Sequence, residues 1–136
     1  MDHIFTMGVL GLGEGRSVIS AVLNSRMWEL GNICDLNEAL CKERCEEFGL
    51  NKYTTSYEEM LKDPKIDVIG IYTPDQLHAR HIKMALLAGK HVICTKPLMI
   101  NLDEAKELVR VQKETKKAVF VGQSSRYFEP ALRQRR

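Results

Sequence analysis

Short apolar runs alternate with amphipathic segments along almost the whole chain. The apolar runs occupy residues 4–10, 28–34, 53–55, 67–72, 91–94 and 118–121, and segments with helical periodicity or helix caps separate them at 15–25, 37–48, 56–62, 75–88 and 101–116. Because nearly continuous apolar runs are typical of strands buried on both faces, this order predicts an α/β fold: a doubly wound parallel sheet of about six strands with helices on both faces. In the helix expected at 37–48, the residues predicted to face inward are Leu36, Leu40, Cys41, Cys45 and Phe48.

The composition excludes several classes of protein. The 136 residues suffice for one domain, and 20 basic against 18 acidic residues give a formal net charge of +2, without the basic excess that is typical of nucleic-acid modules. No apolar run approaches the roughly 20 residues that span a bilayer, and no export signal is visible, so we expect a cytoplasmic protein with no membrane or nucleic-acid partner. In that compartment the four cysteines are expected to be free thiols.

A glycine-rich turn follows the first predicted strand and precedes a helix. One glycine there permits a tight turn, and a second lets the backbone approach a pyrophosphate that faces the N–H groups of the helix. The residues predicted to line this turn are Gly11, Leu12, Gly13, Glu14, Gly15 and Arg16. The third glycine of the usual fingerprint would fall at position 16, which is Arg16, whereas Gly15 stands one place early. Arg16 and Ser17 are therefore further candidates for a phosphate contact.

An acid ends the second predicted strand. Asp35 stands 22 residues after Gly13, where a carboxylate can accept hydrogen bonds from the adenosine ribose hydroxyls of a dinucleotide and would repel a 2′-phosphate. Leu36 and Asn37 follow it, with no arginine to receive that phosphate. The sequence thus favours NAD over NADP. In the alternative interpretation, Gly11 and Gly13 form a plain loop and Asp35 caps a helix.

Two further segments follow predicted strands, at 73–78 and 95–98. Lys96 is the best candidate for chemistry, since an ammonium at the carboxyl end of a buried strand can polarise a hydroxyl or carbonyl and help to move its proton. An ordinary surface lysine is the alternative. His78 and His81 have a spacing that could bind a metal, but no partner ligand stands nearby in the sequence, so we predict no metal site, a structural His78 and an exposed His81. Gln123 follows the last strand and lines either the cleft or a plain loop.

Together these residues resemble the N-terminal half of the Gfo/Idh/MocA family, the glucose–fructose oxidoreductase and inositol dehydrogenase group. The resemblance runs from about Phe5 to Pro130 and implies a Rossmann fold. Six pieces of sequence carry it, in order: Gly11-Leu12-Gly13, Ile33-Cys34-Asp35, Tyr57-Glu58-Glu59-Met60-Leu61 with Asp63-Pro64 and Ile66-Asp67, Thr73-Pro74 with His78, Ala88-Gly89-Lys90-His91-Val92, and Lys96-Pro97-Leu98.

The resemblance implies a role for each matched residue. Gly11, Gly13 and Asp35 would bind the dinucleotide, and Lys96 would touch both nicotinamide and substrate. The residues expected beside the nicotinamide half are Thr73, Pro74, Asp75, His78, Thr95, Lys96 and Pro97. Two of these depart from the family's pattern, because Thr95 replaces a glutamate and Asp75 replaces a frequent asparagine.

The resemblance also implies a dehydrogenase that acts on a sugar, polyol or related hydroxy compound. Residues 1–123 would form its dinucleotide-binding domain, and residues 124–136 would begin the connection to a C-terminal substrate domain, so the chain alone is expected to be inactive. A stand-alone dinucleotide-binding module remains an alternative, as does a methyltransferase-like domain, which would have no use for Lys96-Pro97. A surface that includes Tyr127, Phe128 and Leu132 would then be exposed, from which we expect a homo-oligomer.

Overall fold

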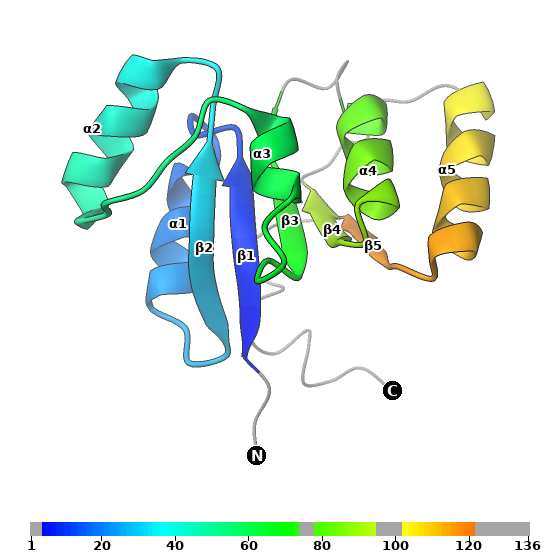
Figure 1. Ribbon diagram of the computed structural model, residues 1–136, viewed down its shortest axis with the longest axis horizontal. Coiled ribbons are helices and arrows are strands. Elements are labelled where there is room, and N and C mark those ends of the chain that lie inside the picture. Colours follow the sequence, from blue (N-terminus) through cyan, green and yellow to red (C-terminus); the bar gives the residue numbers. More distant parts are fainter. Residues whose placement is uncertain (1–3, 74–77, 95–101, 122–136) are drawn as a thin grey trace.

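The computed structural model describes residues 4–73, 78–94 and 102–121 of the chain. It contains one parallel sheet with the strand order β2-β1-β3-β4-β5 (Figure 1). The five strands are β1 (Phe5–Leu10), β2 (Trp28–Cys34), β3 (Val68–Ile71), β4 (His91–Cys94) and β5 (Val119–Val121). The predicted α/β class and the parallel, doubly wound sheet are confirmed.

The prediction of a sixth strand at 53–55 is wrong, because the described residues there do not form a strand. Thr54 forms only an isolated bridge beside β2, in which its N–H donates to the carbonyl of Ile33 at 3.0 Å. Directly after it, the Thr54 hydroxyl accepts a hydrogen bond from the N–H of Ser56 at 3.0 Å, and Ser56 caps the next helix. The run is thus bent into a turn after one bridging residue, and the sheet formed by the described residues has five strands.

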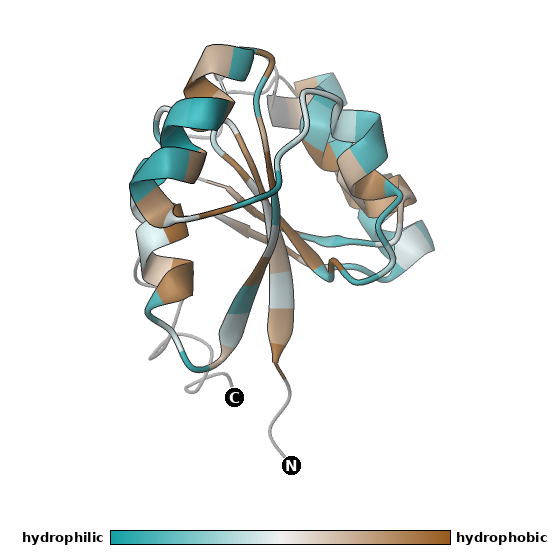
Figure 2. Ribbon diagram, turned by 60° about the vertical axis from the view of Figure 1, so that its left-hand side comes forward, coloured by the Kyte–Doolittle hydropathy of each residue, from teal (hydrophilic) through white to brown (hydrophobic). Residues whose placement is uncertain are grey.

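Helices cover both faces of the sheet (Figure 2). They are α1 (Arg16–Leu23), α2 (Glu38–Phe48), α3 (Tyr57–Leu61), α4 (His78–Leu87) and α5 (Leu102–Thr115). Successive strand residues face opposite sides, so Val9 of β1 shares a core with Ile19 of α1, whereas Leu10 shares the other core with Ile82 of α4. One core therefore joins α1 and α2 to the sheet, and the other joins α3, α4 and α5 to its opposite face.

Local capping residues fix the ends of α2 and the start of α3, and the sequence predicts two of them, Gly49 and Ser56. The Asn37 side chain accepts a hydrogen bond from the N–H of Leu40 at 3.2 Å, and Gly49 ends α2 with a φ of +69°, where a side chain would be strained. Ser56 accepts from the N–H of Glu59 at 3.2 Å and so caps α3. These caps fix where the chain leaves each helix for the next strand.

The inward face of α2 differs from the prediction at one end. Cys41 is fully buried and Leu40, Cys45 and Phe48 are partly buried, but the Leu36 side chain is 88 % exposed. Leu36 precedes the first helical residue and stands on the loop that leaves β2, outside the helix periodicity. Its exposure places an apolar side chain on the surface next to Asp35.

The direction of winding reverses between β1 and β3. The chain leaves β1 through α1 to β2 on one side, and later returns to place β3 against the other side of β1. Backbone hydrogen bonds join the carboxyl ends of all three strands: the N–H of Gly11 donates to Cys34 at 2.9 Å and the N–H of Tyr72 donates to Leu10 at 2.8 Å. In open α/β sheets, this reversal at the carboxyl ends is where ligands bind.

The cysteines are all free, as the sequence predicts, and three of the four are buried. Burial is the main cause that raises the pKa of Cys34 to about 12 and that of Cys94 to about 11. Among the described helices, none combines the length and the apolar character that a membrane crossing requires.

Candidate functional site

The turn after β1 packs against the end of β3. Gly11 has a φ of +92°, and a Cβ added there would lie 2.7 Å from the carbonyl carbon and oxygen of Tyr72 and 2.9 Å from the N of Thr73. Only a residue without a side chain fits so close to a neighbouring backbone. The tight turn predicted at Gly11 is therefore present, and its glycine is required by the contact between the turn and β3.

The next two glycines differ in their surroundings. Gly13 is exposed, and a Cβ there would have no protein atom within 4 Å. Gly15 is buried, and a Cβ there would collide with the carbonyl oxygen of Gly11 and lie 2.8 Å from Val9 Cγ1. Close contact between helix and strand is the role of the third glycine in dinucleotide fingerprints. Gly15 performs it here, which explains why position 16 can carry Arg16.

The start of α1 presents backbone donors. Gly15 is the N-cap of this helix, and no side chain caps it. Its own N–H donates to the carbonyl of Gly11 at 3.1 Å, which closes the turn. Within the described residues, no acceptor is found for the N–H groups of Gly13 and Glu14, and both residues are exposed. Free N–H groups together with the dipole at a helix N-terminus favour an anion.

Asp35 joins the ends of β1 and β2. Its Oδ2 accepts a hydrogen bond from the N–H of Leu12 at 2.9 Å, and its Oδ1 accepts one from the N–H of Asn37, also at 2.9 Å. The cap of α2 is Asn37, so Asp35 is not the helix cap of the alternative interpretation. Each carboxylate oxygen accepts more than one hydrogen bond, so Asp35 keeps capacity for a ligand hydroxyl.

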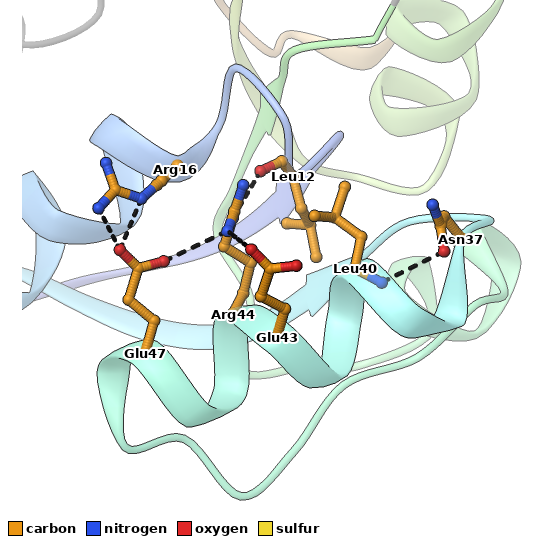
Figure 3. Close-up of polar contacts among 7 residues, drawn as sticks. All are labelled: Leu12, Arg16, Asn37, Leu40, Glu43, Arg44 and Glu47. Atoms are coloured by element: carbon orange, nitrogen blue, oxygen red, sulfur yellow. Dashed lines mark hydrogen bonds and ion pairs between the residues drawn. The ribbon is translucent and has the colours of Figure 1, made fainter.

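Arg16 and Arg44 form an ionic network beside the turn (Figure 3). The Arg16 guanidinium, which the sequence predicts as a phosphate contact, pairs with Glu47 of α2, where Nε donates to Oε2 at 2.6 Å. This hydrogen bond raises the pKa of Arg16 and lowers that of Glu47. Ser17, the other phosphate candidate, places its hydroxyl 3.5 Å from the carbonyl oxygen of Glu14.

Sequence reasoning missed Arg44. It stands three residues after Cys41 on the buried side of α2, and its Nε donates to the carbonyl oxygen of Leu12 at 2.9 Å. The available signal was its spacing: a charged residue on the apolar stripe of an amphipathic helix must find a partner, because an unpaired charge is costly to bury.

The end of β3 is joined to α4 by Thr73. Its hydroxyl lies 3.0 Å from Nδ1 of His81, and the Tyr57 hydroxyl donates to the backbone carbonyl of His81 at 2.8 Å. The rings of Tyr57 and His81 meet edge to face, with centroids 5.1 Å apart. The expectation of an exposed His81 is wrong, because this residue is partly buried between the end of β3 and α3.

Of the remaining predicted site residues, only His78 lies within the described part of the chain. His78 begins α4, and its side chain is not among those described. The other predicted site residues lie outside the described residues: Pro74, Asp75, Thr95, Lys96, Pro97 and Gln123. The segments that carry them follow β3, β4 and β5, and β3 and β4 end side by side, since Ile71 pairs with Cys94.

Comparison with known proteins agrees with this geometry. Residues 5–123 match the model of an oxidoreductase family with an NAD-binding Rossmann fold. The scyllo-inositol 2-dehydrogenase (NAD⁺) of Bacillus subtilis is 31% identical over 136 residues, which cover 96% of this chain and 39% of that protein. The chain thus spans about two fifths of the length of this relative.

Solved structures show the same fold. Biliverdin reductase from Synechocystis, in complex with biliverdin and NADP⁺, has a TM-score of 0.79 at 28% identity, over 85% of this chain and 37% of that one. The WlbA dehydrogenase from Chromobacterium violaceum, in complex with NADH and UDP-GlcNAcA, has a TM-score of 0.80 at 26% identity, over 89% of this chain and 35% of that one. From the glycine turn, the acid after β2 and the family match, we conclude that the chain belongs to the Gfo/Idh/MocA oxidoreductase family, in which it forms the NAD-binding Rossmann fold.

Proposed function

We propose that this chain is the dinucleotide-binding part of an NAD(P)-dependent dehydrogenase that acts on a sugar, polyol or related hydroxy compound. The observation that carries the proposal is the pair formed by Asp35 and the glycine turn, in which an exposed Gly13 and an uncapped helix stand beside a carboxylate at the reversal point of the sheet. The Bacillus subtilis relative, named as an inositol dehydrogenase, supports the substrate class.

The residues present fit a dinucleotide. The space over Gly13 is open, so a pyrophosphate can approach the backbone there without meeting a side chain. The N–H groups of Gly13 and Glu14 and the start of α1 then face the phosphates. In this arrangement Gly11 and Gly15 act within the protein, by permitting the turn and the close contact of α1 with β1.

Asp35 favours NAD over NADP in this proposal. Its oxygens are held by two backbone N–H groups and keep capacity to accept the ribose hydroxyls. A 2′-phosphate would meet a negative charge instead. Arg16 and Arg44, the arginines of the neighbouring network, are already paired with glutamates and so offer little compensation to that phosphate. The exposed Leu36 side chain beside Asp35 offers an apolar surface to the adenine ring.

The segments after β3, β4 and β5 would complete the nicotinamide half. When bound, the nicotinamide supplies the hydride acceptor. We assign Lys96 to the substrate hydroxyl, where an ammonium can hold and move the proton as the carbon is oxidised. The residues assigned to positioning the nicotinamide are Thr73, Pro74, Asp75, His78, Thr95, Pro97 and Gln123. Thr73 is itself positioned by its contact with His81.

A dinucleotide-binding module without catalysis is the second candidate, because the chain spans only 35–39% of the relatives described above. Titration calorimetry with NADH, NADPH and S-adenosylmethionine tests the binding that both candidates require. We expect NADH to bind and S-adenosylmethionine not to bind. Absence of NADH binding, or preferential binding of S-adenosylmethionine, would overturn the proposal.

Turnover by a longer parent separates the two candidates, and turnover by this chain alone tests whether it is catalytically complete. With inositols and sugars as substrates, we expect this chain alone to give no NADH formation, since the residues that position a substrate would lie in the remainder of a longer parent. Steady turnover near typical enzyme rates, about 1–1000 per second, would show that the chain is catalytically complete. In a longer parent that is a dehydrogenase, Lys96→Met should lower kcat far more than it weakens NAD binding. A parent that is a non-catalytic module would show no turnover even as the wild type.

A further inference from the structure

Arg44 is a buried charge that reaches the glycine turn from another helix. Its residue is 8 % exposed on the inner side of α2. Nε donates to the carbonyl oxygen of Leu12 at 2.9 Å, while Nη1 pairs with Glu43 and Glu47 at 3.3 Å each. A charge-assisted bond of this kind to a backbone carbonyl is stronger than a neutral one. It joins α2 to the turn across 32 residues of sequence.

We propose that Arg44 is a positioning residue for the pyrophosphate of the dinucleotide, an inference that rests on the proposed function. In a trans peptide the C=O and the following N–H point in opposite directions. By holding the carbonyl of Leu12 on the side of α2, Arg44 directs the N–H of Gly13 to the other side. The surroundings of Gly13 are open, since a Cβ there would meet no protein atom within 4 Å, so a phosphate can approach this N–H.

The peptide units on both sides of Leu12 are then held from outside the turn. Asp35 fixes the N–H of Leu12, and Arg44 fixes its carbonyl. Glu47 extends the network, because one of its oxygens contacts Arg44 and the other contacts Arg16, the first residue of α1 (Figure 3). The turn is thereby preorganised before a ligand arrives, which lowers the entropic cost of binding.

The test replaces Arg44 with methionine, which keeps a long side chain for packing and removes the donor. Arg110→Met is the matched control, because Arg110 pairs with Glu107 and Glu114 on α5 and does not contact the turn. We expect Arg44→Met to weaken NADH binding about tenfold, the size of a lost charge-assisted hydrogen bond. The affinity for adenosine, which has no phosphates, should stay unchanged, and Arg110→Met should match the wild type for both ligands.

The ligand-free chain gives a second readout. In ¹⁵N relaxation, we expect the Gly13 amide to be ordered in the wild type and in Arg110→Met, and to lose order in Arg44→Met. If Arg44→Met does not fold, Arg44→Gln, which is neutral and polar, replaces it in both measurements.

The outcomes distinguish this inference from the proposed function. Equal NADH affinity in the Arg44 and Arg110 variants, or an equal loss for NADH and adenosine, would overturn the role of Arg44 and leave the function standing. A wild type that does not bind NADH would overturn the proposed function. In that case the relaxation data still test Arg44. If the Gly13 amide is as ordered in Arg44→Met as in the wild type, Arg44 does not hold the turn.

Discussion

The N–H of Leu12 donates a hydrogen bond to Oδ2 of Asp35 at 2.9 Å, so the acid that follows β2 also holds the turn that follows β1. Asp35→Asn should therefore have two effects. An amide has one accepting oxygen, so one of the two backbone bonds is lost, at a cost of about 1 kcal/mol in the free energy of unfolding. The negative charge is lost as well, so the preference for NADH over NADPH, measured by calorimetry, should fall about tenfold, because a charged hydrogen-bond partner contributes about this much.

Asp67 offers the control for this variant. Its Oδ2 accepts a hydrogen bond from the N–H of Thr6 at 3.0 Å, at the opposite end of the strands. Asp67→Ala removes this one acceptor, so it should lower the free energy of unfolding to a similar degree and leave the cofactor preference unchanged. Tighter binding of NADPH than of NADH by the wild-type chain would contradict the proposed role of Asp35 from the outset.

The glycines of the turn should separate binding from stability. At Gly13 a methyl group meets no protein atom within 4 Å, so Gly13→Ala should fold with a free energy of unfolding within about 0.5 kcal/mol of the wild type. The same methyl group occupies the space proposed for the pyrophosphate, so NADH binding should be lost. Full NADH affinity in Gly13→Ala would place the phosphates elsewhere.

Gly15→Ala should behave in the opposite way. Its Cβ would collide with the carbonyl of Gly11 and crowd Val9, and such overpacking costs about 1–3 kcal/mol. Denaturant unfolding should therefore show a clear loss of stability in Gly15→Ala that is absent in Gly13→Ala. If the two variants unfold at the same denaturant concentration, the close contact of α1 with β1 does not contribute as described.

His91 should make stability depend on pH. Its Nδ1 accepts a hydrogen bond from the N–H of Ala118 at 3.0 Å, and burial, with help from Lys117, lowers the pKa of the imidazole below 6.5. The neutral form therefore stabilises the folded state fully above about pH 6.5, and this contribution is lost as the pH falls through the lowered pKa. Between pH 7 and pH 5, the wild-type Tm should therefore fall further than that of His91→Asn.

The asparagine variant is chosen because its side-chain oxygen can accept the Ala118 N–H at any pH in this range. The measurement is a series of thermal unfolding curves for both proteins. Parallel decreases of Tm would show that protonation of His91 has no part in the acid sensitivity.

The chain should associate with itself. β5 stands at the end of the strand order, so among the described strands it has a neighbour on one side only. A strand edge of this kind can pair with a second chain. Sedimentation should show a species whose mass rises with protein concentration, and a 15.5 kDa monomer at every concentration would exclude this.

The sequence predicted those features that depend on neighbouring residues. The order of strands and helices follows from apolar runs and periodicity, and the end of α2 and the start of α3 follow from Gly49 and Ser56. The turn at Gly11 and the acid at Asp35 could be placed together because both follow strands that end at the same edge of the sheet.

Features that depend on packing between distant segments could not be predicted. The bond from Arg44 to Leu12 requires the angle at which α2 crosses the turn, and the burial of His81 requires the position of Tyr57. The run at 53–55 has residues that favour a strand, but the turn at Ser56 limits its pairing with β2 to a single bridge at Thr54. For Arg44 and His81, the deciding contact joins segments that are far apart in the sequence and that no local pattern relates. For Thr54, a turn overrides the local preference for a strand.

The network in Figure 3 also bears on the response of the site to salt. Arg16 and Arg44 are already compensated by Glu43 and Glu47, so phosphates arriving at the turn meet backbone dipoles more than free cations. Dissolved ions screen exposed charges over about 8–10 Å at ordinary ionic strength, whereas short hydrogen bonds to fixed N–H groups are screened much less. If the proposed site holds the phosphates, their binding should therefore release few counter-ions, and the affinity for NADH should depend only weakly on salt concentration.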